Sequence, residues 1–84
     1  MNNILATISI YSSNRQINSI KINEILSENA KLIISRMGVN VERRCSSSCS
    51  AVIVLCAKGE EKQIKKLKAD LAKIKETKVK LNIL

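Results

Sequence analysis

Residues 50–57 constrain the fold of this chain more than any other segment. Their sequence, Ser-Ala-Val-Ile-Val-Leu-Cys-Ala, is almost continuously apolar, so an extended strand there would carry apolar side chains on both faces. Such a strand is predicted to be buried on both faces. Alternate side chains form two sets, which are Ala51, Ile53 and Leu55 on one face and Val52, Val54 and Cys56 on the other.

Three other segments have the pattern of strands. Residues 4–11 alternate between two faces, with Ile4, Ala6, Ile8 and Ile10 on one of them. Residues 79–83 also alternate, and they are predicted to form a last strand with one face in water. Residues 32–44 are long for a single strand, and Gly38 in the middle predicts a bend or a bulge. The small polar residues 45–49 indicate a turn.

Two helices are predicted between the strands. The side-chain oxygens of Ser12, Ser13 and Asn14 can accept hydrogen bonds from the N–H groups of a first helical turn, so a helix should run from there to about residue 28. Glu60 and Glu61 favour the start of a second helix through the helix dipole. The apolar arc of the first helix is wide and contains Ile17, Ile22, Ile25 and Leu26, with Ile20 outside it. The apolar stripe of the second helix is narrow and contains Ile64, Leu67, Leu71 and Ile74.

The predicted order of elements, strand-helix-strand-strand-helix-strand, is typical of the ferredoxin-like βαββαβ sandwich. We therefore expect a single α+β domain over residues 1–84, in which a four-stranded antiparallel sheet carries both helices on one face. The first and third strands would lie at its centre. Because the other face has no helix, one apolar set of residues 50–57 would face water in a monomer. Such a patch marks an interface, which predicts a homo-oligomer formed through the open sheet face or by pairing of strand edges.

Composition excludes several classes of protein. The chain has 84 residues, with no proline, histidine, tryptophan or phenylalanine, and Tyr11 is its one aromatic residue. It has no Ser-His-Asp or Cys-His nucleophile, no histidine ligand for a metal and no paired acid–base carboxylates, so we expect neither an enzyme nor a cofactor. No apolar run approaches the ~20 residues that span a bilayer. Since the sequence also lacks a secretory signal, it predicts a cytoplasmic protein without a membrane partner.

Cys45, Cys49 and Cys56 are the candidates for a reactive cluster. The favoured interpretation is free thiols, two of them in a serine-rich turn and one in the core of a strand. A redox pair is the first alternative, since Arg43 and Arg44 would lower the pKa of Cys45. A metal or iron–sulfur site is the second, although such sites favour two-residue gaps and four protein ligands.

The chain is also strongly basic. Fifteen Lys and Arg against seven Asp and Glu give a net charge of +8. This charge fits a nucleic-acid partner, for which Lys62, Lys66 and Lys73 of the second helix would be the binding residues. RNA readers of this topology stack bases on aromatic side chains of the sheet, and Tyr11 alone could do so here. A solvated helix face is therefore the favoured interpretation of these lysines.

Several stretches of the sequence resemble one family. Residues 22–26 (Ile-Asn-Glu-Ile-Leu), residues 33–38 (Ile-Ile-Ser-Arg-Met-Gly), the apolar third strand and the spaced apolar residues of 64–74 are similar to iron-only hydrogenase system regulators. These are small stand-alone proteins related to the ACT-like C-terminal domain of nickel-responsive regulators. The resemblance implies a ferredoxin-like fold, assembly through the sheets, a regulatory or ligand-sensing role with a small-molecule effector, and a transcriptional or hydrogenase-system partner protein.

The expected bend at Gly38 suggests where a ligand would bind, because a glycine in a long strand permits close approach of another backbone or a ligand. The ligand would lie at subunit interfaces, near Arg36 and Gly38 and near the start of the second helix at Gly59. Arg36 is the candidate to face an anionic ligand, although a structural ion pair is the favoured interpretation of this residue. Alanines stand at positions 69 and 72, where the family would have glycines, and an asparagine stands at position 40, where it would have a proline. A nickel site of the kind that nickel-responsive regulators use needs imidazoles, and this chain has none.

Overall fold

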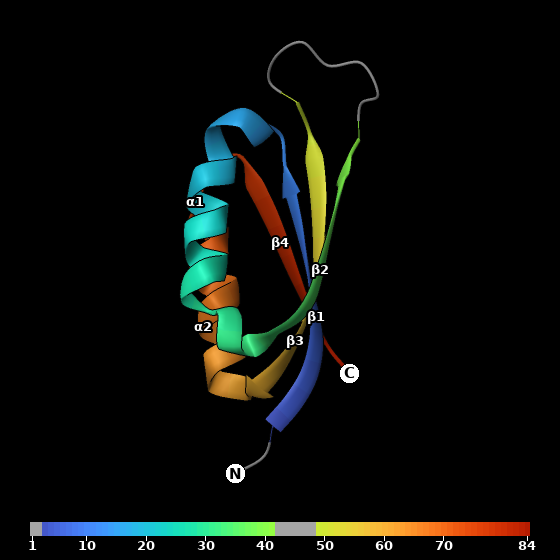
Figure 1. Cartoon of the computed structure of the whole chain (residues 1–84), viewed down its shortest axis with the longest axis vertical. Coiled ribbons are helices and arrows are strands. Elements are labelled where there is room, and N and C mark those ends of the chain that lie inside the picture. Colours follow the sequence, from blue (N-terminus) through green and yellow to red (C-terminus); the bar gives the residue numbers. More distant parts are fainter. Residues whose placement is uncertain (1–2, 42–48) are drawn as a thin grey trace.

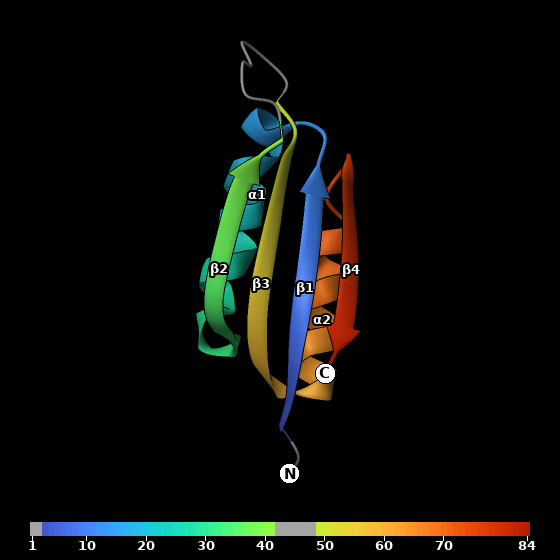
Figure 2. The same ribbon diagram turned by 90° about the vertical axis from the view of Figure 1, so that its right-hand side faces the viewer.

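The computed structural model describes residues 3–41 and 49–84. Strand β1 (Asn3–Ser12) leads into helix α1 (Arg15–Glu28), a short 3-10 helix η1 (Ala30–Leu32) and strand β2 (Ile33–Asn40). Strand β3 (Ala51–Glu60), helix α2 (Glu61–Ala72) and strand β4 (Thr77–Ile83) complete the order. The strands form one antiparallel sheet in the order β2-β3-β1-β4, and both helices lie on the same face of it (Figures 1 and 2). The ferredoxin-like prediction is confirmed.

The pairing of β1 with β3 at the centre of the sheet sets the core. Ile8 stands opposite Leu55, and both side chains are fully buried on the helix-facing side. Because side chains alternate along a strand, the same register places Val54 on the open face. The core between sheet and helices is made of Ala6, Ile8, Ile10, Ile22, Leu26, Leu55, Ala57, Ile64, Leu67, Leu71 and Ile74.

Helix α1 begins as the sequence predicts but buries a narrower face. Asn14 is its N-cap, and the side-chain oxygen of Asn14 accepts a hydrogen bond from the Ile17 N–H at 3.3 Å. Ile20 is exposed as expected. Ile17 belongs to the wide apolar arc, but its side chain is 68% exposed. Ile17 is at the margin of the apolar arc, about 140° around the helix from Ile22 at ~100° per residue, and the sheet covers the part of the arc near Ile22.

Helix α2 starts with a capping box. The Glu60 side chain accepts from the backbone N–H of Gln63, and the Gln63 side chain accepts from the backbone N–H of Glu60. Strand β3 runs without a break into this cap, because its pairing with β1 continues to the Asn3–Glu60 pair. Ile64, Leu67 and Leu71 are buried, as their stripe predicts.

The irregularity in β2 is not where the sequence placed it. Gly38 pairs in regular register with Ile53, so the prediction of a bend or bulge at this glycine is wrong. The register shifts instead between Ile33 and Ser35. The extra residue is accommodated where the chain leaves η1, at the start of the strand, because the pairing with β3 has barely begun there. The end predicted for this strand, at residues 42–44, lies outside the described residues.

Buried apolar residues of the helices should contribute more to the free energy of unfolding than exposed ones. Leu67→Ala should lower the free energy of unfolding by about 2–5 kcal/mol, because a fully buried leucine leaves a cavity between α2 and the sheet. Ile20→Ala, on the exposed side of α1, should change it by less than about 0.5 kcal/mol. Urea denaturation followed by circular dichroism measures both. Equal losses for the two variants would contradict this description of the core.

Candidate ligand pocket

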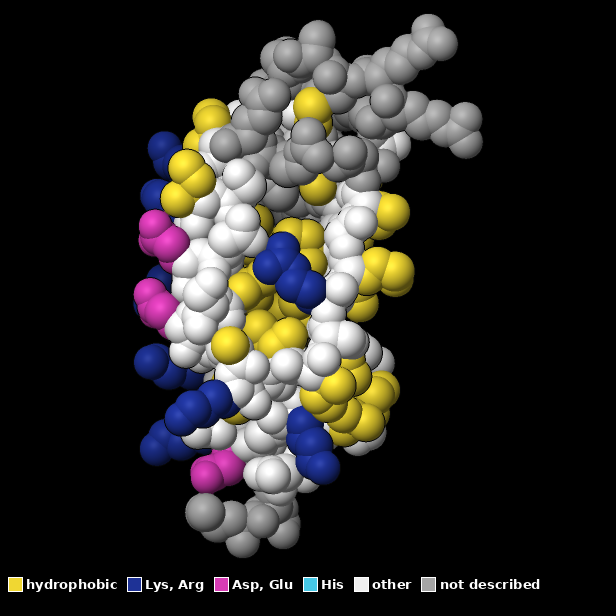
Figure 3. All heavy atoms as spheres, in the orientation of Figure 1, with side chains coloured by type: hydrophobic (Ala, Val, Ile, Leu, Met, Phe, Trp, Pro, Cys, Tyr) yellow, Lys and Arg dark blue, Asp and Glu magenta, His cyan; other side chains and the backbone are white. Residues whose placement is uncertain are grey.

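A pocket of about 390 Å³ opens between α1 and the half of the sheet formed by β2 and β3. In the space-filling view it is a hollow with an apolar floor, crossed by a basic side chain (Figure 3). It is lined by Ser12, Ser19, Ile22, Asn23, Arg36, Gly38, Val39, Ala51 and Ile53. Its volume falls within the ~300–1,000 Å³ that is usual for small-molecule sites.

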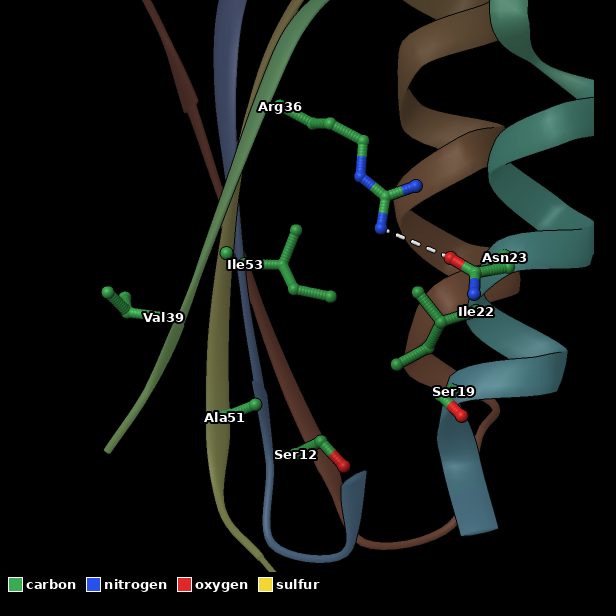
Figure 4. Close-up of a pocket in the computed structure, with 9 residues that line it drawn as sticks. Ser12, Ser19, Ile22, Asn23, Arg36, Val39, Ala51 and Ile53 are labelled. Carbon is green, nitrogen blue, oxygen red and sulfur yellow. Dashed lines mark hydrogen bonds between the residues drawn. The ribbon is translucent and has the colours of Figure 1, made fainter. Parts of the chain in front are cut away.

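Arg36 gives the pocket its charge. The side chain leaves β2 on the helix-facing side and extends toward α1, where its Nη2 donates a hydrogen bond to Asn23 Oδ1 at 3.1 Å (Figure 4). The one ion pair within the described residues joins Lys65 and Glu61, so no described carboxylate neutralises Arg36. A guanidinium group has five N–H donors in a planar fork, and the bond to Asn23 uses one of them. Arg36 can therefore bind an anion without giving up an existing salt bridge.

Ser12 adds a second donor from the end of β1. Its side chain is buried, and its Oγ accepts hydrogen bonds from the Asn14 backbone N–H at 3.3 Å and from Asn18 Nδ2 at 3.2 Å. These bonds use the oxygen as an acceptor, so its O–H proton remains to be donated and has no acceptor among the described residues. Ser19 brings another hydroxyl from α1. The pocket therefore has more donors than acceptors, which suits a negatively charged ligand.

The floor of the pocket is apolar. Ile53 and Ala51 of β3 point into it from the sheet, and Ile22 faces them from α1 (Figure 4). Val39 points away, toward the other side of the sheet. A cationic mouth above an aliphatic floor fits a small anion with a compact aliphatic body.

The structure brings two of the three predicted ligand-site residues together. Arg36 and Gly38 line the same pocket, whereas Gly59 is buried elsewhere, under Leu32. A Cβ on Gly59 would lie 2.6 Å from Leu32 Cδ2, so this glycine serves the packing of η1 against β3. Sequence reasoning missed Ser12, Ser19 and Asn23 as lining residues. Their local patterns predict caps and helix surface, and no local signal shows which side chains meet across the sheet.

The cysteines do not all have the state that the sequence favoured. Cys56 is a free thiol, half-buried on the open face of β3. Cys49 is disulfide-bonded, so the prediction of a free thiol at this position is wrong. Spacing alone cannot predict a disulfide, because the bond depends on the Cα separation and on the directions of the Cβ atoms. Cys45 lies outside the described residues. No three His, Cys, Asp or Glu side chains gather into a metal site within residues 3–41 and 49–84.

The lysines proposed for nucleic-acid binding are placed apart from the aromatic residue. Lys62, Lys66 and Lys73 are all exposed on or directly after α2, which lies on the helix side of the sheet. Tyr11 lies on the open face, where its hydroxyl donates to Ser50 Oγ at 3.3 Å. A base stacked on Tyr11 would therefore be on the opposite side of the sheet from these lysines.

Solved structures of other proteins share this fold. The structure of uncharacterized protein TM1266 from Thermotoga maritima gives a TM-score of 0.87 at 24% sequence identity, with 99% of each chain covered. The ACT domain of GTP pyrophosphokinase from Chlorobium tepidum gives a TM-score of 0.72 at 15% identity, over 100% of this chain and 89% of that one. The structure of CPII bound to ADP, AMP and acetate, from Thiomonas intermedia K12, gives a TM-score of 0.60 at 11% sequence identity, over 100% of this chain and 90% of that one. These likenesses define an ACT-like, ferredoxin-like domain.

The sequence identifies the family. The model of the TM1266-like family, described as "Iron-only hydrogenase system regulator, putative", matches residues 4–81. The chain belongs to this family, which confirms the resemblance found in its sequence, and the family indicates a regulatory role. Among curated proteins, none matches the chain. In the described part of the structure, neither helix has the length and apolar character needed to cross a membrane.

The two glycines should respond differently to the same substitution. Gly38→Ala should be neutral or raise the free energy of unfolding by about 0.5–1 kcal/mol, because the new Cβ would meet Ile53 at an ordinary 3.8 Å and alanine loses less entropy on folding. Gly59→Ala should lower it by about 1–3 kcal/mol, because Leu32 must move. Thermal unfolding of both variants tests the difference. A destabilised Gly38→Ala protein would show that this glycine has a role in folding.

Proposed function

We propose that this protein is a cytoplasmic regulatory module that senses a small anionic effector, bound in the pocket between α1, β2 and β3. The observation that carries the proposal is the surplus of donors there: among the described residues, Arg36 has no carboxylate partner and the Ser12 O–H has no acceptor. The volume of about 390 Å³ and the aliphatic floor favour an effector with a small apolar body, and the single charged side chain of the lining, Arg36, favours one acidic group. A short branched monocarboxylate has this chemistry.

The side chains around the pocket favour binding over catalysis. The serines that line it have no histidine, carboxylate or lysine beside them in the lining to act as a general base. The regulatory description of the family points the same way. The CPII structure, which has a similar fold, contains ADP, AMP and acetate, so a domain of this shape binds small anions in at least one other protein.

Isovalerate provides a direct test of the pocket. At ten times its Kd it should contribute about 1.4 kcal/mol of stability, which for a domain of this size is a rise in Tm of about 5–10 °C. Arg36→Gln should abolish the rise, because it removes the charge that pairs with the carboxylate. Lys21→Gln removes the same charge from the exposed side of α1 and should leave the rise intact.

Differential scanning fluorimetry with isovalerate, the neutral isovaleramide and inorganic phosphate separates the contribution of the negative charge from that of the aliphatic body. Isovaleramide has the same aliphatic body and should have no effect. A rise that survives Arg36→Gln would overturn the assignment of Arg36, and the absence of a rise with every anion would overturn the anionic effector.

We further propose that the module is a homo-oligomer, assembled through the open sheet face. Val52, Val54 and Cys56 are only half-buried there, and the face continues onto β2 with Met37 and Val39, which are 66% and 57% exposed. The register aligns Met37 with Val54 and Val39 with Val52, so these side chains form one continuous apolar patch. Covering this patch with a second copy would remove it from water.

Val54→Glu tests this interface. A carboxylate at the centre of the patch would be buried without a partner in the assembly, so native mass spectrometry should show an oligomer for the unmodified protein and a folded monomer of about 9.3 kDa for the variant. Ile20→Glu makes the same change on α1, away from the sheet face, and should leave the oligomer intact. A monomeric unmodified protein would contradict the interface.

A further inference from the structure

The backbone N–H and C=O groups along the outer edge of strand β4 have no strand partner among the described residues. Strand β4 is an edge strand, with β1 on one side and no other described strand on the other (Figure 2). The N–H of Leu84 donates to the carbonyl of Leu5 at 2.9 Å. Because opposed pairs in an antiparallel ladder alternate between bonded and non-bonded, Val79 and Leu81 are in non-bonded pairs with β1. Their N–H and C=O groups therefore point outward from the sheet.

A groove runs along this same edge, between α2 and β4. It has a volume of about 590 Å³ and is lined by Lys65, Lys68, Ala69, Val79, Lys80 and Leu81. The two residues that direct their backbone groups outward, Val79 and Leu81, thus also line the groove. Figure 2 shows α2 behind the sheet, beside β1 and β4.

The groove is strongly basic. Lys65 and Lys68 border it from α2, and Lys80 borders it from β4, with Lys78 exposed two residues earlier on the same strand face. Glu61 pairs with Lys65 at 2.6 Å, and this is the one ion pair among the described residues. Lys68, Lys78 and Lys80 therefore have no described carboxylate partner, and their charges are available to an acidic ligand.

We propose that the outer edge of β4 and the groove beside α2 bind an extended acidic segment of a partner protein, which adds to the sheet as a fifth strand. The segment would pair with the backbone of Val79 and Leu81. Acidic side chains on its helix-facing side would reach Lys65 and Lys68, and those on its other side would reach Lys78 and Lys80. This site is separate from the proposed effector pocket, which lies at the β2 side of the sheet.

The chemistry of the edge favours a polypeptide over the two other candidate occupants. Val79 and Leu81 offer both donors and acceptors, and a phosphate backbone can accept from the N–H groups but cannot donate to the carbonyls. A second copy of β4 would bring Lys78 and Lys80 close to their own counterparts, and like charges opposite one another destabilise a strand pair. The lysines thus disfavour pairing of β4 with itself and favour an acidic strand.

The test uses the full chain and a fluorescein-labelled eight-residue peptide in which Glu-Glu and Val-Val pairs alternate, so that an extended strand carries Glu on both faces. Fluorescence anisotropy should show saturable binding. A peptide with Gln in place of every Glu should bind at least about tenfold more weakly, because it loses the ion pairs. A peptide with Glu retained but with methyl groups on alternate backbone nitrogens should also lose binding, because it cannot pair with the strand.

Two triple variants of the protein have the same change in net charge. Lys65→Gln, Lys68→Gln and Lys80→Gln together should weaken binding about tenfold. Lys62→Gln, Lys66→Gln and Lys73→Gln together should weaken it less than about twofold, because these lysines do not line the groove. Circular dichroism establishes that each variant is folded.

The proposal is overturned by any of three results. Equal weakening by the two triple variants would show that the peptide responds to overall charge. Full binding of the backbone-methylated peptide would exclude strand addition. Tighter binding of a single-stranded oligothymidylate, in competition with the peptide and lost in the groove variant, would assign the surface to nucleic acid.

Discussion

The register between β1 and β3 is the constraint on which the rest of the structure depends. These two strands pair over their whole length, from Asn3 opposite Glu60 to Ser12 opposite Ala51. A slip of one residue would put Ile8 and Leu55 on opposite faces of the sheet, so one of the two strands would turn its core side chains away from the helices. The same register decides that Val54 and Cys56 face away from the helices, so the packed core and the open apolar patch have one origin. Both helices pack on the face of the sheet that this register makes apolar.

Much of this architecture could be predicted from the sequence, because it is encoded in periodicity. The alternation in β1, the all-apolar β3 and the stripe of α2 each specify an element and the face that it buries. Ile17 shows the limit of this reasoning: a helical pattern defines an arc of apolar residues, and the sheet decides how much of the arc is covered. The irregularity at the start of β2 shows another, since glycine permits a bulge but the pairing with β3 decides where one is needed.

The candidate site was predicted less completely, for a physical reason. Arg36 and Gly38 are two residues apart on one strand, so their proximity to each other is local. The proximity of Arg36 to Asn23 and of Ser12 to the same pocket depends on how α1 crosses the sheet, which no spacing in the sequence records. The disulfide of Cys49 could not be predicted for the same reason, because it depends on how two side chains approach each other in three dimensions.

Asn18 forms hydrogen bonds to two segments that are far apart in the sequence. Its Nδ2 donates to Ser12 Oγ at 3.2 Å and to the carbonyl of Lys75 at 2.8 Å, in the turn that precedes β4. One buried amide therefore holds both a wall of the pocket and the approach to the opposite edge of the sheet. An effector bound to the Ser12 hydroxyl, as proposed above, would contact the same hydrogen-bond network as this turn, so its binding would be coupled to the order of the turn. Such coupling is reciprocal: whatever stiffens the turn alters the affinity of the pocket by the same factor.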